Sequence, residues 1–152
     1  MIEILSGQML EIDHLFSYRG KIKSAELEEI GKKMEEKVNL AGAKRIGMPI
    51  TVTYGVENDT MEIEILLPIN RKISSTDEFC YKEKIKIVNA LVAKHKGSPM
   101  KLQNTCNELN QYIAENKLVP ITAGYNVTKK TNPIDIEDTE IDVYVGISPN
   151  IL

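Results

Sequence analysis

The sequence contains an internal repeat, which restricts the possible folds more than any other feature. The segment Pro49–Val56 matches Pro120–Val127 at five of eight positions, at a spacing of 71 residues. Further along, Glu62–Ile69 matches Glu140–Ile147 with three identities, at a spacing of 78 residues. Because the two matches occur in the same order, we interpret the chain as two copies of one structural unit.

Each copy is predicted to contain one amphipathic helix. Residues 24–43 carry apolar side chains at the three-and-four spacing of a helix face, with Ser24 as the N-cap residue. Residues 98–116 repeat this pattern, with Ser98 as N-cap and Pro99 at the first helical position. Alternating apolar residues before each helix, and two more such segments after it, predict strands. Each copy therefore is a strand-helix-strand-strand unit.

We expect these units to give an α+β fold. In this fold, antiparallel sheets form a central groove, and one helix per half covers the opposite face. Residues 1–152 are predicted to form a single domain, with pseudo-repeats at about 9–69 and 83–148. The polar residues 70–82 are predicted to be the linker between the repeats.

Composition and charge argue against several partners. The 19 basic residues are interleaved with 22 acidic ones and the net charge is −3, so we expect no direct binding of nucleic acid. No apolar run approaches the roughly twenty residues that span a bilayer, and the N-terminus lacks a signal-peptide pattern. We therefore expect a cytoplasmic protein without a membrane span. Its many lysines and isoleucines and few arginines are typical of a bacterial protein from an AT-rich genome.

Metal and cofactor chemistry is not expected either. The residues His14, His95, Cys80 and Cys106 are scattered along the chain without the spacing of a metal site. The glycines occur singly, so no phosphate-binding loop is present. The sequence predicts neither a metal nor a cofactor.

The second strand of each predicted hairpin has one apolar face and one acidic face. Since side chains alternate along a strand, Glu62 and Glu64 in the first copy, and Glu140 and Asp142 in the second, point away from the helices. Tyr144 lies two residues beyond the last of these. Two interpretations stay open. Either the carboxylates form the solvated face of a half-exposed sheet, or the copies pack about a pseudo-twofold axis and the carboxylates enter a shared groove.

Two tyrosines in the preceding strands, Tyr54 and Tyr125, occupy matching positions of the repeat. A tyrosine can present its ring to a ligand while its hydroxyl finds a polar partner. It also packs well across strands, and parity groups Tyr54 with Ile50 and Val52, so whether it faces the groove or the core stays open. No catalytic residue is assigned. The candidate ligand-binding residues are Asp142, Glu140, Glu64, Tyr144, Tyr54 and Tyr125.

This pattern resembles the GyrI-like small-molecule-binding domain, which also forms the effector-binding half of AraC-type and MerR-type regulators. The resemblance spans about residues 9–148 and rests on the duplication, the Pro-Ile-Thr-x-x-Tyr-x-Val segments and the strand endings Glu64–Ile69 and Asp142–Ile147. It implies a cleft in which Asp142, with Glu140 beside it, meets a cationic and lipophilic ligand. The chain departs from the family in having an aspartate where glutamate is usual, a glycine in place of the second strand's proline, and no tryptophan.

Three functions are compatible with these features. The resemblance implies a stand-alone small-molecule-binding protein, without a DNA-reading helix-turn-helix, that takes an amphipathic or cationic organic ligand between the repeats. An alternative is a protein-interaction or accessory module that uses the same groove for a protein partner. A second alternative is a small hydrolase of the same fold, with Asp142 or Glu64 as the base and a tyrosine as the donor. An enzyme is the less favoured class, because the sequence has no nucleophile elbow and no Ser-His-Asp arrangement.

Overall fold

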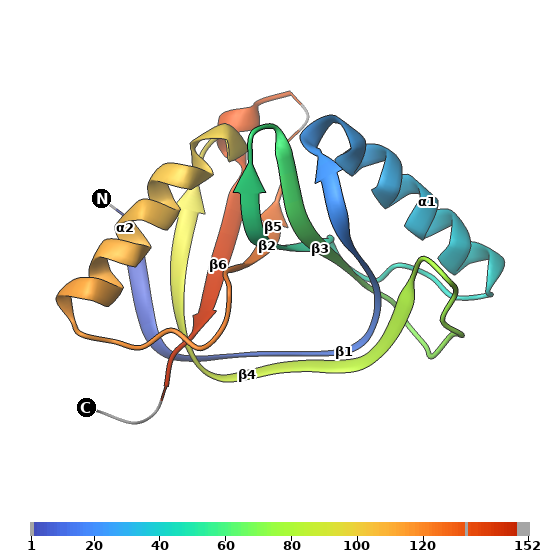
Figure 1. Cartoon of the computed structure of the whole chain (residues 1–152), viewed down its shortest axis with the longest axis horizontal. Helices are drawn as coiled ribbons and strands as arrows, with labels where there is room; N and C mark the ends of the chain where they lie inside the picture. The colour runs from blue at the N-terminus through green and yellow to red at the C-terminus, as the bar shows by residue number, and fades with distance from the viewer. Residues whose placement is uncertain (1, 133, 149–152) are drawn as a thin grey trace. The chain divides into compact units, whose positions relative to one another are not determined.

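The computed structural model describes residues 2–132 and 134–148, which form an α+β fold of six strands and two main helices (Figure 1). The strand-helix-strand-strand order expected for each copy is confirmed. Short 3-10 turns occur at Ser24–Glu26, Pro99–Lys101 and Ile136–Asp138. The main elements are β1 (Glu3–Lys23), α1 (Leu27–Leu40), β2 (Ile50–Glu57), β3 (Thr60–Pro68), β4 (Cys80–Lys96), α2 (Leu102–Glu115), β5 (Tyr125–Lys130) and β6 (Glu140–Gly146).

The chain divides into two compact units. The first unit is Glu11–Lys86, and the second unit comprises the residues up to Leu10 together with those from Ile87 onward. The two long strands β1 and β4 each contribute one part to either unit. Each unit thus contains one helix and an antiparallel arrangement of three strand segments.

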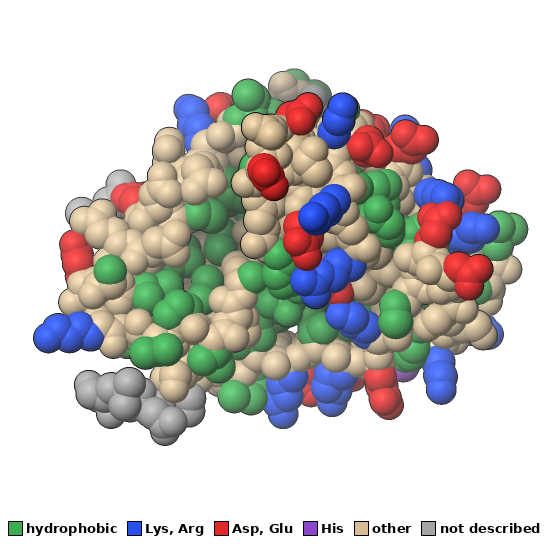
Figure 2. Space-filling view, in the orientation of Figure 1, with side chains coloured by type: hydrophobic (Ala, Val, Ile, Leu, Met, Phe, Trp, Pro, Cys, Tyr) green, Lys and Arg blue, Asp and Glu red, His purple; other side chains and the backbone are tan. Residues whose placement is uncertain are grey.

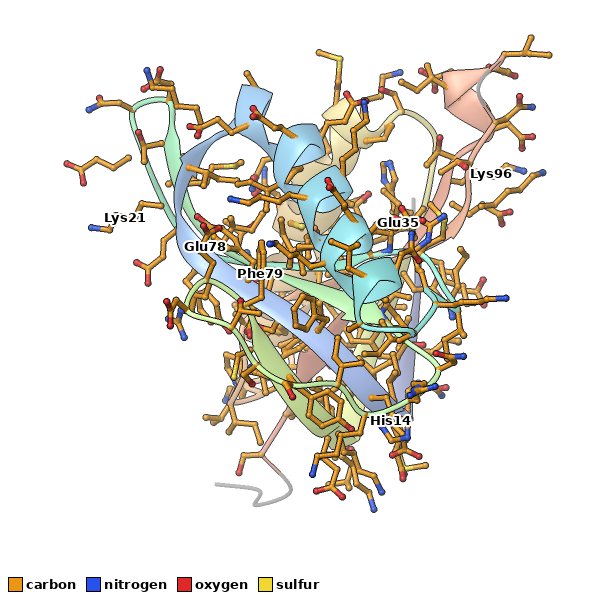
Figure 3. All side chains as sticks on the ribbon, turned by 90° about the vertical axis from the view of Figure 1, so that its right-hand side faces the viewer. His14, Lys21, Glu35, Glu78, Phe79 and Lys96 are labelled. Atoms are coloured by element: carbon orange, nitrogen blue, oxygen red, sulfur yellow. The ribbon has the colours of Figure 1, made fainter. Side chains whose placement is uncertain are left out.

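In the first unit, β3 is the central strand and pairs with β1 on one side and β2 on the other. Its side chain Ile65 packs in a buried cluster with Met34 and Val38 of α1. Phe79 lies beside α1 in Figure 3, and its ring centroid is 5.3 Å from that of Phe16. The apolar face of β3 therefore meets the helix, as its alternation predicts.

The second unit repeats this arrangement with β6 as the central strand between β4 and β5. Val143 and Val145 of β6 form a buried cluster with Leu91 of β4 and with Leu109 and Ile113 of α2. Helix α2 covers this face of its sheet (Figure 1). The neighbouring side chains of β6 consequently point to the other face.

The two helices begin differently. Ser98 is an N-cap as predicted, because its Oγ accepts a hydrogen bond from the backbone N–H of Met100 at 3.2 Å. The same prediction for Ser24 is wrong, because this residue already belongs to the first helical turn. There the carboxylate of Glu26 accepts a hydrogen bond from the backbone N–H of Lys23 at 3.0 Å.

Strand register corrects the repeat in β2 and β5. Val52 lies opposite Glu64 of β3, and Val127 lies opposite Asp142 of β6. If the two acids are equivalent, the equivalent valines are 75 residues apart, whereas the sequence match in this segment has a spacing of 71. The match is therefore displaced by one full turn of the alternation pattern from the structural equivalence.

Tyr54 and Tyr125 consequently do not occupy equivalent strand positions, contrary to the prediction. The Pro-Ile-Thr motif leads directly into β2, which begins at Ile50, but it precedes β5, which begins only at Tyr125. In addition, β2 has an irregular register between Thr53 and Gly55, so Tyr54 lies at a bulge. Identical letters thus lie in different backbone surroundings.

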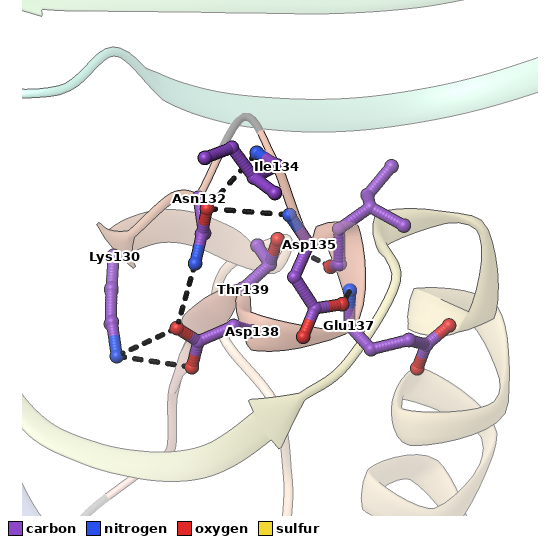
Figure 4. A network of polar contacts seen from close by, with 8 residues as sticks. Lys130, Asn132, Ile134, Asp135, Glu137, Asp138 and Thr139 are labelled. Atoms are coloured by element: carbon purple, nitrogen blue, oxygen red, sulfur yellow. Dashed lines mark hydrogen bonds and ion pairs between the residues drawn. The ribbon is translucent and has the colours of Figure 1, made fainter.

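Polar contacts hold the connection between β5 and β6 (Figure 4). The side-chain oxygen of Asn132 accepts hydrogen bonds from the backbone N–H groups of Ile134 at 3.0 Å and Asp135 at 3.3 Å. Lys130 forms an ion pair with Asp138 at 3.0 Å. These contacts fix the start of β6, and with it the side of the sheet to which each of its side chains points.

Several general features of the described residues concern partners. No helix in 2–132 or 134–148 is long and apolar enough to cross a membrane. No cluster of metal-ligating side chains occurs in the same part of the chain. Acidic and basic side chains lie intermingled on the face drawn in Figure 2.

Truncation of the α1 core residue Met34 tests this packing. Met34 is fully buried, whereas Leu40 on the same helix is 75% exposed. We expect Met34→Ala to lower the free energy of unfolding by about 2 to 5 kcal/mol, because it removes buried contacts and leaves a cavity. The control Leu40→Ala should change it by less than about 0.5 kcal/mol. Equal losses in urea denaturation would contradict the assignment of the core.

Candidate functional site

The four acidic residues of the central strands differ in exposure. Glu64 is 3% exposed and Asp142 is 8% exposed, while Glu62 is partly and Glu140 fully accessible to solvent. The inner acid of each pair is therefore buried and the outer one lies at the surface. A solvated sheet face does not account for Glu64 and Asp142, since buried carboxylates need compensation.

In the first unit, Glu64 is held by three donors from three strands. Ser17 of β1 donates to Oε2 at 2.8 Å, and the Lys82 ammonium of β4 lies at 2.5 Å from the same oxygen. The Tyr54 hydroxyl of β2 donates to Oε1 at 2.9 Å. Both carboxylate oxygens are thus occupied. The open question about Tyr54 is also answered, because its hydroxyl lies on the Glu64 face and not in the cluster under α1.

The charge of Glu64 follows from these contacts. Burial acts to raise the pKa of Glu64, but the hydrogen bonds from Lys82, Ser17 and Tyr54 and the charge of Lys82 lower it. The net result is a pKa below the ordinary value of a glutamate. Glu64 is therefore an anion at neutral pH, and Lys82 neutralises it.

An open cavity of about 280 Å³ lies beside this network, with Arg19, Glu64, Phe79 and Lys82 among its lining residues. The Arg19 guanidinium carbon lies 4.0 Å from the centre of the Tyr54 ring. One of its nitrogens is also 3.3 Å from the carboxylate of the neighbouring acid on β3. The chain itself thus supplies a cation to this aromatic ring.

In the second unit, Asp142 is compensated much less completely. Within residues 2–132 and 134–148, its carboxylate has one polar partner, the Lys94 ammonium at 3.9 Å. That distance is too long for a hydrogen bond. The side chain of Asp142 is 11% exposed and that of Lys94 is 46% exposed. Asp142 therefore is a largely buried anion whose counter-charge is held loosely.

Two tyrosines lie on the same sheet face as Asp142. Tyr125 of β5 is directly opposite Tyr144 of β6, and Asp142 lies two residues before Tyr144 on the same strand. Burial raises the pKa of Tyr144, and the negative charge of Asp142 raises it further. The structure thus brings together three of the six candidate residues in one unit, as a carboxylate beside two half-buried rings.

Sequence reasoning missed the basic and hydroxyl partners of the two acids. Ser17 and Lys94 lie on strands that were recognised, but their neighbours depend on register. Lys82 fell into the predicted linker, whereas the structure places it in β4. A usable signal was present: opposite charges at matching strand positions, since Arg19 pairs with Glu64 in register just as Lys94 pairs with Asp142.

Comparison with known proteins shows similarity at the level of structure. No protein-family model and no curated protein sequence matches the chain. The crystal structure of the EcmrR C-terminal domain matches with a TM-score of 0.75 and 14% identity, over 97% of this chain and 98% of that one. The chain has the fold of the EcmrR C-terminal domain. In a complex of EcmrR with DNA, the TM-score is 0.80 with 16% identity over 95% of this chain, which spans 57% of the length of that EcmrR chain.

Two further solved structures share the fold at greater distance. SAV2435 bound to tetraphenylphosphonium matches with a TM-score of 0.55 and 6% identity, over 98% of this chain and 94% of that one. A hydrolase from Listeria innocua matches with a TM-score of 0.56 and 10% identity, over 93% and 91%. The fold therefore occurs both in ligand-binding proteins and in a protein described as an enzyme.

Acid titration of stability tests the Glu64 network. Because the native pKa of Glu64 is lowered, its contribution to stability is complete above the ordinary carboxyl pKa of about 4.5 and is lost as the pH falls through the native pKa. We expect Glu64→Gln to lower the free energy of unfolding by about 1 to 3 kcal/mol at pH 7. The difference from wild type should shrink below about pH 4.5.

The matched control is Glu62→Gln, two residues away on the same strand, whose side chain is 40% exposed. It should cost less than about 1 kcal/mol at pH 7, because exposed ion pairs contribute little. A Glu64→Gln variant whose stability differs from wild type by the same amount at pH 3 and pH 7 would contradict the network.

Proposed function

We propose that the chain binds a small organic cation on the sheet face formed by Asp142, Tyr144 and Tyr125. The observation that carries this proposal is the state of Asp142, a carboxylate with 11% of its side chain exposed and an ammonium partner no nearer than 3.9 Å. A buried charge with so little compensation is costly for a protein. A cationic ligand that lies against it supplies the missing charge.

The surroundings of Asp142 favour an organic cation over a small inorganic one. A large cation with diffuse charge and apolar groups loses less hydration on entering a partly buried site. Tyr144 and Tyr125 offer ring faces that attract such a cation. A metal ion needs several oxygen or nitrogen ligands, and the described residues contain no such cluster.

The fold supports the same function. SAV2435 holds tetraphenylphosphonium, a lipophilic cation, in its structure. The EcmrR domain with the matching fold is part of a DNA-associated protein. We propose that the chain is a GyrI-like effector-binding domain and that the acidic residue of its last strand has the ligand-binding role that this resemblance implies. Glu140, exposed at the margin of the same face, belongs to the proposed site.

The Glu64 site of the first unit has a different role in this proposal. Its carboxylate accepts hydrogen bonds from three side chains, and Tyr54 already faces the guanidinium of Arg19. An added cation gains little from an acid that Lys82 has neutralised. Of the candidate residues, Glu64 and Tyr54 therefore stabilise the unit in which they lie.

Binding of a matched pair of ions tests the proposal. Tetraphenylphosphonium and tetraphenylborate have nearly the same shape and opposite charge, so they separate charge recognition from hydrophobic adsorption. We expect the cation alone to bind in isothermal titration calorimetry. At a concentration of a hundred times its dissociation constant it should stabilise the protein by about 2.7 kcal/mol.

The variant Asp142→Asn should weaken this binding by about 10- to 100-fold, because it removes the charge while keeping the shape of the side chain. Glu108→Gln, at an exposed position of α2, changes the net charge equally and should leave the affinity unchanged. Equal binding of both ions, or full affinity in Asp142→Asn, would refute the proposed function.

A further inference from the structure

The two units place a basic residue at the same register position. Arg19 of β1 lies directly opposite Glu64 of β3, and Lys94 of β4 lies directly opposite Asp142 of β6. In each central strand another glutamate precedes the buried acid by two residues, namely Glu62 or Glu140. Each unit therefore has one cross-strand cation with a buried and an exposed acid within reach.

In the first unit, this cation does not pair with the buried acid. Arg19 contacts the exposed Glu62 at 3.3 Å and the ring of Tyr54 at 4.0 Å, while Glu64 receives its hydrogen bonds from other side chains. A long basic side chain at this position thus reaches the acid two residues earlier on the neighbouring strand. This diagonal contact leaves the buried acid to other partners.

In the second unit, the cation is found on the buried acid, but weakly. The Lys94 ammonium lies 3.9 Å from Asp142, without a hydrogen bond, and the Lys94 side chain is 46% exposed. The exposed Glu140 occupies the place that Glu62 has in the first unit. Lys94 can therefore make the diagonal contact that Arg19 makes, with little loss.

We infer that Lys94 is a built-in counter-ion of Asp142 which a cationic ligand displaces toward Glu140. This inference rests on the proposed function of the Asp142 face. Without ligand, Lys94 compensates the buried charge. When a cation binds, Lys94 moves to the exposed acid, because two positive charges next to one carboxylate repel each other. Lys94 therefore lowers the affinity for organic cations, and Glu140 reduces this loss.

Removal of the Lys94 charge tests the inference. We expect Lys94→Met to bind tetraphenylphosphonium about three- to tenfold more tightly than wild type, since the ligand no longer competes with an ammonium for Asp142. Lys94→Gln should change the affinity in the same direction. The control Lys96→Met lies two residues along the same strand face and also removes one positive charge. It should leave the affinity within about twofold of wild type.

A second substitution tests the destination of Lys94. Glu140→Gln should weaken binding in the wild-type background by about two- to threefold, because the displaced ammonium loses its acceptor. In the Lys94→Met background the same substitution should have a smaller effect. Thermal unfolding of each variant verifies that it is folded.

The outcomes separate the inference from the proposed function. Tighter binding by Lys94→Met than by Lys96→Met supports both. Binding by wild type with no gain in Lys94→Met overturns the inference and leaves the proposed function standing. If only Lys94→Met binds, the inference is supported in its strongest form, with Lys94 acting as an inhibitor. If neither wild type nor any Lys94 variant binds the cation, both are refuted.

Discussion

A carboxylate buried on the central strand of a three-stranded sheet must find a counter-charge, since its desolvation costs several kcal/mol when it is left alone. Each unit of this protein carries one such group, Glu64 or Asp142, on the sheet face away from its helix. The neighbouring strands have to supply the compensation. The position of Ser17, Tyr54 and Lys82 in the first unit follows from this requirement.

The same requirement explains why both faces of β3 are buried. Ile63, Ile65 and Leu67 form the face that includes the α1 cluster, yet Glu64 and Leu66 on the other face are equally inaccessible. Alternation of apolar and acidic residues usually marks one dry and one wet face. Here it marks a face packed by apolar side chains and a face satisfied by hydrogen bonds, and periodicity alone does not distinguish the two cases.

Much of the architecture was predictable from local patterns. Helix spacing, the Ser98 cap and the acids on the central strands depend on residues close in sequence, and these predictions are confirmed. The errors concern relations between strands. The tyrosine motif looked equivalent in both copies, but β5 begins later than β2, and register decides which side chains face each other. Lys94 and Lys82 were missed for the same reason, because a cross-strand partner can be named only once the register is known.

The two copies show how one arrangement serves stability or binding according to how completely its acid is compensated. Three hydrogen bonds on Glu64 leave no unused capacity, and removing any one of them leaves a buried polar group unpaired. A single distant ammonium on Asp142 leaves capacity unused, and that capacity is available to a ligand of the right charge. A lysine on a flexible stem suits this role, because it is strongly hydrated and returns to water at little cost. Loose compensation of a buried charge therefore marks the face that can accept a cation.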